Sequence, residues 1–181
     1  MDEQRAFLLE IARRLDRAGI PYMVTGSVAL AAYAVPRMTR DIDIVVEIGP
    51  SDVERLVALF AEDCFIERDA VKRAAASRDM FNVIHNAWIT KADFIVRKDE
   101  PYRRTEFGRR RRIDVDGVAL WVVAPEDLIL SKLWWSRGKA SERQETDVRD
   151  LLAVAGLDRA YLDRWATELG LEEALRRLRG A

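Results

Sequence analysis

The chain has 181 residues, of which 49% are hydrophobic and 34% charged, and this length suits one domain or a domain with a helical extension. The formal net charge of −1 excludes a protein that is basic over its whole surface, so any contact with nucleic acid must be local. The single cysteine, Cys64, excludes an internal disulfide and a cysteine-rich metal cluster.

The N-terminal segment and the apolar runs bear on where the protein acts. Residues 1–15 are charged and amphipathic, unlike a signal peptide. No apolar run approaches the ~20 residues of a membrane-spanning helix, so we expect no contact with a membrane. These features predict a cytoplasmic protein.

Helix and strand patterns alternate through the first two thirds of the sequence. Apolar residues at helical spacing, bounded by capping residues, glycine or proline, predict helices at 7–18, 27–34, 51–62 and 69–76. Runs of β-branched and aromatic residues predict strands at 21–26, 41–48, 81–87 and 88–96, and a hairpin at 110–124. The Asp116-Gly117 pair marks the hairpin turn.

Beyond Pro125 the pattern is helical, with helices predicted at 125–136, 142–154, 158–169 and 171–178. The sequence therefore predicts an α+β (mixed α/β) fold. We expect a mixed β-sheet core flanked by helices over residues 1–124, with a helical subdomain of residues 125–181 packed on it.

Two aspartates mark the start of the predicted strand at 41–48. Side chains two apart on a strand share a face, so Asp41 and Asp43 lie together while Ile42 and Ile44 point to the opposite side. Neighbouring carboxylates raise each other's pKa unless a cation compensates, and Mg²⁺ binds such oxygen ligands together with substrate phosphates. The alternative is a polar strand end with both side chains in solvent.

Gly26-Ser27 and Asp93 favour the metal site. Gly26-Ser27 stands between a strand and a helix, where backbone N–H groups bind phosphate and glycine permits close approach; an ordinary N-cap serine is the alternative. Asp93 is an acidic residue in a strand rich in Ile, Phe and Val. A third carboxylate beside the first two would allow two ions to act at phosphorus. A solvent-facing position is the alternative for Asp93.

The turn before the aspartates carries two arginines, Arg37 and Arg40. They either contact phosphate and brace the aspartates or are solvated turn residues.

The ordered set of these motifs resembles the nucleotidyltransferase (polymerase-β-like) superfamily. It consists of a Gly-Ser turn after a first strand, a helix, a strand of pattern hDhDh (h, apolar) and a later single Asp in a strand. The downstream segments APEDLILSKLWWSR and ETDVRDLLAV are similar to the minimal nucleotidyltransferases of the AbiEii/AbiGii toxin type. The resemblance covers about residues 20–155.

The resemblance implies an enzyme that transfers a nucleoside monophosphate from a nucleoside triphosphate such as ATP to an acceptor hydroxyl, with Mg²⁺ or Mn²⁺ as cofactor. Gly26 and Ser27 would hold the triphosphate, aided by Arg40. Asp41 and Asp43 would bind the metal. Asp93 would be the third carboxylate, which binds the second ion or takes the proton of the acceptor hydroxyl.

Two residues of the helical half enter the site through the same resemblance. Lys132 matches the family lysine on the first C-terminal helix and would contact the phosphates. Asp147 matches the later acidic motif, with Asp150 one turn further on, and is tied to activity. Alternatively, Lys132 extends past the core into water, and the two aspartates form an exposed helical face.

The resemblance implies an RNA acceptor, especially a tRNA end, or a protein side chain, together with a cognate antitoxin protein. Residues 97–112 support a nucleic acid, since eight basic and three acidic residues give a local charge of +5, with Tyr102 and Phe107 interleaved. A solvated loop is the alternative for this segment. A small-molecule, antibiotic-type nucleotidyltransferase and a non-catalytic nucleotide- or partner-binding module remain open as alternatives for the chain.

Overall fold

The computed structural model describes residues 3–35, 39, 41–137 and 142–180. Its strands are β1 (Tyr22–Thr25), β2 (Asp41–Val46), β3 (Cys64–Ile66), β4 (Met80–His85), β5 (Lys91–Val96), β6 (Arg111–Val115) and β7 (Val118–Val122). Its α-helices are α1 (Glu3–Ala18), α2 (Gly26–Leu30), α3 (Val53–Phe60), α4 (Arg68–Ser77), α5 (Pro101–Gly108), α6 (Pro125–Trp135), α7 (Glu142–Leu152), α8 (Arg159–Glu168) and α9 (Glu172–Arg179). A 3₁₀ turn (Pro50–Asp52) precedes α3.

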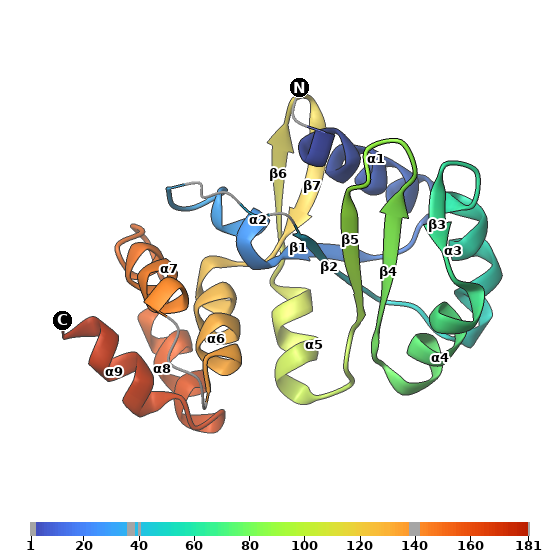
Figure 1. Ribbon diagram of the computed structural model, residues 1–181. Coiled ribbons are helices and arrows are strands. Elements are labelled where there is room, and N and C mark those ends of the chain that lie inside the picture. Colours follow the sequence, from blue (N-terminus) through green and yellow to red (C-terminus); the bar gives the residue numbers. More distant parts are fainter. Residues whose placement is uncertain (1–2, 36–38, 40, 138–141, 181) are drawn as a thin grey trace.

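The described strands form one seven-stranded mixed sheet in the order β3-β4-β5-β2-β1-β7-β6 (Figure 1). Strand β2 runs parallel to β5, and β1 runs parallel to β7. The other neighbouring pairs are antiparallel. Because β2 and β5 are parallel neighbours, the first residues of the two strands lie side by side, at one end of these strands.

Strand β2 shows how the sequence pattern divides the two faces of the sheet. Ile42, Ile44 and Val46 have no solvent exposure, whereas Asp41 is exposed. Apolar side chains at alternate positions therefore anchor β2 in the core and leave the aspartates on the opposite face. This confirms the predicted orientation of the two isoleucines.

The helices form two groups. Helices α1, α3 and α4 contact one another in series and pack along the sheet. Helices α7, α8 and α9 gather around α6 at the end of the molecule remote from α4, and α6 contacts α2 (Figure 1). The contact between α6 and α2 brings the helical group next to the start of β2.

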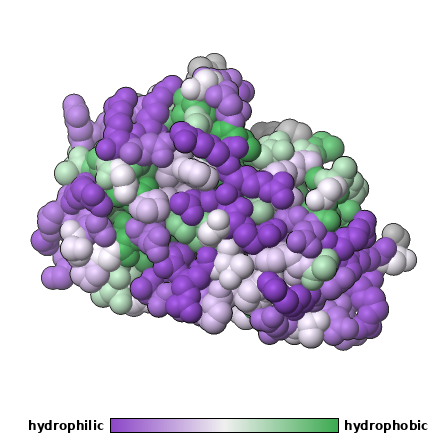
Figure 2. Space-filling view, turned by 180° about the vertical axis from the view of Figure 1, so that it is seen from behind, coloured by the Kyte–Doolittle hydropathy of each residue, from purple (hydrophilic) through white to green (hydrophobic). Residues whose placement is uncertain are grey.

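Polar side chains cover most of the face seen from behind, and apolar residues are confined to separated patches there (Figure 2). In the described residues, no helix combines the length and apolarity that crossing a bilayer requires.

The predicted α+β fold class is confirmed, and three elements differ from the sequence prediction. Helix α2 ends at Leu30, because the next amides bond three residues back rather than four, as Ala32 N does to Ala29 O. Strand β3 is a three-residue edge strand, too short for its pattern to be seen. Helix α5 lies in the basic segment, where the prediction had no element; Pro101 begins it.

Candidate active site

Four charged side chains share one face of the sheet at the start of β2 and β5. Asp41 lies opposite Lys91, and Asp43 lies opposite Asp93, in the register of the two strands. Positions two apart on a strand project to the same side, so all four side chains leave the sheet together. The structure thus brings together the three predicted aspartates and places a lysine among them.

The turn at Gly26 touches this face directly. Gly26 has a φ of +65°, in the left-handed region that favours glycine, and it follows Thr25, which pairs with Asp43 across β1 and β2. A Cβ atom at Gly26 would lie 2.0 Å from Asp43 Oδ2, far inside contact distance. Only glycine fits here, because the Asp43 carboxylate lies against the backbone where α2 begins.

The electrostatics of Asp43 reflect this crowding. Burial is the main reason that its pKa is raised to about 6, and the Asp93 and Asp41 carboxylates raise it further. The charges of Lys91 and Lys132 act in the opposite direction. Burial and two like-charged neighbours therefore both disfavour the charged form of Asp43, which a bound cation would favour.

Asp93 is held by two donors. Its Oδ2 accepts a hydrogen bond from Lys91 Nζ at 3.0 Å, and its Oδ1 accepts one from Asn82 Nδ2 on β4. Lys91 Nζ also lies 3.3 Å from Asp41 Oδ1. Lys91 therefore bridges two of the predicted metal-binding carboxylates, Asp41 and Asp93. Asn82 fixes the orientation of the Asp93 side chain.

The residues present fit a divalent ion by chemistry, since three carboxylates face the same space and magnesium and manganese prefer such oxygen ligands. However, within the described part of the chain no three acidic, histidine or cysteine side chains are grouped as a preformed metal site. The ammonium of Lys91 stands between the oxygens of Asp41 and Asp93. These oxygens can serve a metal ion only if Lys91 moves away.

Lys132 of α6 and Asp147 of α7 form a buried ion pair. Lys132 Nζ lies 2.6 Å from Asp147 Oδ2, and the two side chains are 5% and 4% exposed. Lys132 also donates to Gln144 Oε1 at 3.4 Å. The alternative of a lysine that extends into water is therefore wrong, as is an exposed face at Asp147, although Asp150 is exposed. The Lys132 charge acts on Asp43, so this pair is electrostatically coupled to the aspartate site.

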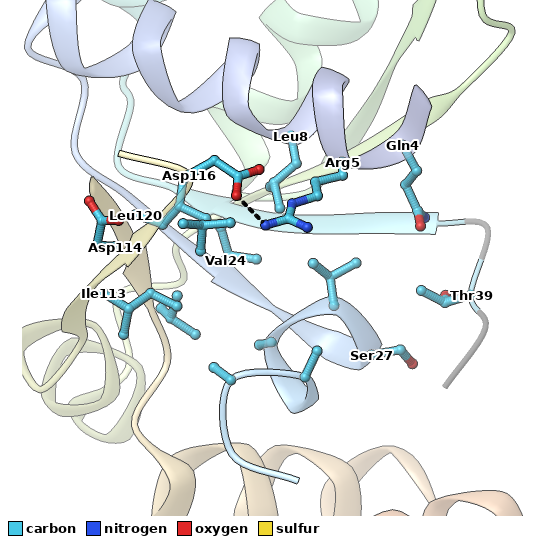
Figure 3. Close-up of a pocket in the computed structure, with 16 residues that line it drawn as sticks. Gln4, Arg5, Leu8, Val24, Ser27, Thr39, Ile113, Asp114, Asp116 and Leu120 are labelled. Atoms are coloured by element: carbon cyan, nitrogen blue, oxygen red, sulfur yellow. Dashed lines mark hydrogen bonds and ion pairs between the residues drawn. The ribbon is translucent and has the colours of Figure 1, made fainter. Parts of the chain in front are cut away.

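Ser27 opens onto a cavity of about 700 Å³ between α1, α2 and the β6–β7 hairpin (Figure 3). Its walls are mostly apolar and include Val24 and Leu120. Figure 3 shows Ser27 and Thr39 on one side of this space and the ion pair between Arg5 and Asp116 on another. The predicted phosphate-binding Arg40, like Arg37, lies outside the described residues.

The basic segment at 97–112 differs from both hypotheses made for it. Much of it is helix α5 rather than a solvated loop. Tyr102 and Phe107, the rings expected to stack on a base, are buried with exposed fractions of 4% and 5%. Neither ring is therefore available to a nucleic acid.

Several arginines of this segment bind partners within the fold. Arg109 contacts two buried carboxylates of α6, with its Nε 3.1 Å from Asp127 Oδ2 and its Nη2 3.1 Å from Glu126 Oε2. Tyr161 of α8 donates to Asp127 Oδ1 at 2.6 Å, and the guanidinium of Arg109 lies over the Tyr161 ring. Arg103 pairs with the buried Glu106. Arg109, and Arg103 through a bond to Ser131 of α6 at 3.1 Å, thus join α5 to the helical group.

Lys91 and Asn82 are the site residues that the sequence prediction missed. The sequence could have identified Lys91 as a site residue, because it stands two residues before Asp93 and so shares its face of the strand. No sequence pattern identifies Asn82, since its position beside Asp93 depends on the pairing of β4 with β5.

The three carboxylates thus share one face at the start of a parallel strand pair, next to a glycine turn. The sequence matches a family model described as nucleotidyltransferase of unknown function (DUF6036) over residues 3–175. The chain belongs to this family, which confirms the predicted superfamily and class of enzyme. No curated protein sequence matches the chain significantly.

Solved structures share the fold. An antigenic nucleotidyltransferase-like protein from Paracoccidioides brasiliensis is 19% identical with a TM-score of 0.60, and the match covers 97% of this chain and 93% of that one. The antibiotic-resistance factor ANT(2'')-Ia is 16% identical with a TM-score of 0.58, over 98% and 94% of the two chains. The lincosamide antibiotic adenylyltransferase LnuA is 11% identical with a TM-score of 0.55, over 86% and 98%. At these identities the likeness establishes the fold alone.

Proposed function

We propose that the chain transfers a nucleoside monophosphate from a nucleoside triphosphate to an acceptor hydroxyl, with Mg²⁺ or Mn²⁺, and releases pyrophosphate. The observation that carries this proposal is the contact of the Gly26 backbone with the Asp43 carboxylate. It puts a turn suited to phosphate next to three carboxylates on one face of the sheet. The grouping of carboxylates does not serve stability, because the three charges repel one another.

On the donor side, Gly26 and Ser27 bind the triphosphate, and Arg40 adds a positive charge to it. Lys132 contacts the phosphates from α6, because its charge already acts on Asp43. Asp147 holds Lys132 charged and in place through the 2.6 Å ion pair. Donor binding thus draws on both the core of residues 1–124 and the helical subdomain of residues 125–181.

On the metal side, Asp41, Asp43 and Asp93 hold the divalent ion. When bound, the ion neutralises phosphate charge that develops during transfer. Asp93 also accepts the proton of the acceptor hydroxyl, since it is the carboxylate furthest along the sheet from Gly26 and the triphosphate. Asn82 orients Asp93 by donating to Oδ1, and Oδ2, which accepts from Lys91 Nζ, becomes available when Lys91 moves away.

The acceptor we propose is RNA, especially a tRNA end, or a protein side chain, as in toxin-type enzymes of the AbiEii kind. On this hypothesis the protein acts in the cytoplasm beside a cognate antitoxin protein. Arg112 is exposed and remains for a nucleic acid to contact.

A small-molecule acceptor is the second candidate. Two observations favour it: much of the basic segment is engaged within the fold, and the cavity beside Ser27 has the size of a small-molecule site. Two of the structural neighbours carry antibiotic names.

The decisive experiment incubates the protein with each labelled nucleoside triphosphate, Mg²⁺, and either total cell RNA with lysate or a panel of hydroxylated small molecules. Label on RNA or protein supports the first acceptor, and label on a small molecule supports the second.

Asp43→Asn should reduce transfer by about 10²-fold or more. It should not lower the melting temperature, because it removes a buried charge. The matched control, Asp69→Asn on the exposed face of α4, should keep full transfer. Full transfer by Asp43→Asn would contradict the proposal.

A further inference from the structure

Lys91 occupies a position that the proposed function does not use. Its ammonium lies 3.0 Å from Asp93 Oδ2 and 3.3 Å from Asp41 Oδ1. Both oxygens belong to side chains that the proposed function assigns to the metal. A cation and an ammonium cannot share these oxygens at close range, because like charges a few ångströms apart repel strongly.

We propose that Lys91 is an internal counter-ion that a divalent cation displaces from Asp41 and Asp93, so that metal binding is weak in the nucleotide-free protein. This inference rests on the proposed metal-binding function. Lys91 holds Asp41 and Asp93 together until a cation replaces it. A metal ion that arrives with the triphosphate brings phosphate oxygens as further ligands, and this offsets the loss of the lysine contacts.

The surroundings allow such an exchange. The Lys91 side chain, at the first residue of β5, is 39% exposed, so its four-carbon stem can turn the ammonium into water. Asp93 is only 12% exposed and stays oriented through its second bond, from Asn82. Departure of the lysine therefore frees Asp93 Oδ2 without releasing the side chain.

The charges of the four side chains set the direction of the effect. Three carboxylates and one ammonium leave a net charge of −2 on this face. Without the ammonium, the face carries −3 and attracts a divalent ion more strongly. We therefore expect removal of the Lys91 charge to tighten metal binding, opposite to the usual effect of deleting a site residue.

The test measures Mn²⁺ binding to the full chain without nucleotide, by the loss of the free-ion electron paramagnetic resonance signal. Lys91→Met and Lys91→Gln remove the charge, and Lys91→Arg keeps it. Lys72→Met, on the exposed face of α4, is the matched control. Thermal unfolding with and without Mn²⁺ is the second readout. Asp43→Asn identifies the site, because a variant that no longer binds Mn²⁺ leaves the free-ion signal undiminished.

We expect Lys91→Met and Lys91→Gln to bind Mn²⁺ about tenfold more tightly than the wild type, and Lys91→Arg and Lys72→Met to match the wild type. The two neutral variants should melt at lower temperature without metal and recover with Mn²⁺. A neutral variant that is unfolded alone and folds with Mn²⁺ supports the inference equally.

Neutral variants that bind Mn²⁺ no more tightly than a binding-competent wild type would overturn this inference alone. So would neutral variants that stay unfolded with Mn²⁺ present. Failure of the wild type and of all Lys91 variants to bind Mn²⁺ would also overturn this inference. The proposed metal dependence falls with it only if removal of divalent ions by a chelator leaves transfer unchanged.

Discussion

At the scale of single residues, the site is defined by close approaches that leave little freedom of substitution. The Gly26 backbone lies against Asp43, Lys91 bridges Asp41 and Asp93, and Lys132 is buried with Asp147. Each contact couples a local conformation to the charge of a neighbour. Single substitutions should therefore separate steric, electrostatic and functional contributions.

Gly26→Ala tests the steric contact. The left-handed backbone costs a residue with a side chain about 1 kcal/mol, and the new Cβ would also push Asp43 aside. We expect loss of transfer and a drop in the free energy of unfolding beyond that of the control. Gly19→Ala is the matched control, because Gly19 has the same φ of +65° with no atom near its Cβ position. Equal effects on transfer from both variants would remove Gly26 from the site.

Asp147→Asn tests the buried ion pair. It leaves the Lys132 charge buried without its carboxylate partner, which should cost about 3 kcal/mol of unfolding free energy and most of the transfer activity. Asp150→Asn, one helical turn away and exposed, should change neither.

The double variant Lys132→Met with Asp147→Leu separates stability from function. It removes both buried charges together, so it should restore most of the stability that Asp147→Asn loses. It should not restore transfer. Recovery of transfer in the double variant would show that the pair is structural only.

At the scale of elements, α5 changes what the basic segment means. Arg109, which directly follows α5, faces α6 and α8, because Glu126 and Asp127 supply the acceptors and Tyr161 a ring. Arg104 of α5, by contrast, is exposed and pairs with Asp99. Burial raises the pKa of Asp127 to about 6, so its charge depends on these partners. The network links the sheet-flanking helix to the helical group around α6.

Arg109→Met tests this network. It leaves Glu126 and Asp127 buried without their guanidinium, so we expect about 3 kcal/mol of destabilisation in chemical denaturation. The Arg112 side chain is exposed, so Arg112→Met should leave the free energy of unfolding nearly unchanged. If RNA is the acceptor, Arg112→Met should instead weaken RNA transfer. Equal stability of the two variants would contradict the structural role of Arg109.

At the scale of the whole molecule, the sequence predicts the sheet core and the helical half, but the pairing of strands decides the site. Alternating Asp and Ile residues on β2 are sufficient to predict which face is polar, and they did so correctly. The sequence predicts that Asp93 lies near Asp43 only if β5 pairs with β2, and the sequence alone does not show this pairing. The partners of Lys91, Asn82 and Arg109 depend on long-range packing that no local pattern encodes.

The response of the whole fold to acid depends on a bond remote from the site. Arg14 of α1 donates to both oxygens of Asp63 at the start of β3, and this hydrogen bonding lowers the pKa of Asp63 to about 2. A carboxylate with a lowered pKa stabilises the folded state above the unfolded-state pKa near 4, and this contribution disappears as the pH falls toward 2. Asp63→Asn should therefore lower the melting temperature at pH 7, and the difference from the wild type should shrink between about pH 4 and pH 2. Asp69→Asn, which removes an exposed carboxylate on α4, is the control measured beside it. A difference that stays constant down to pH 2 would mean that Asp63 stabilises the fold without its charge.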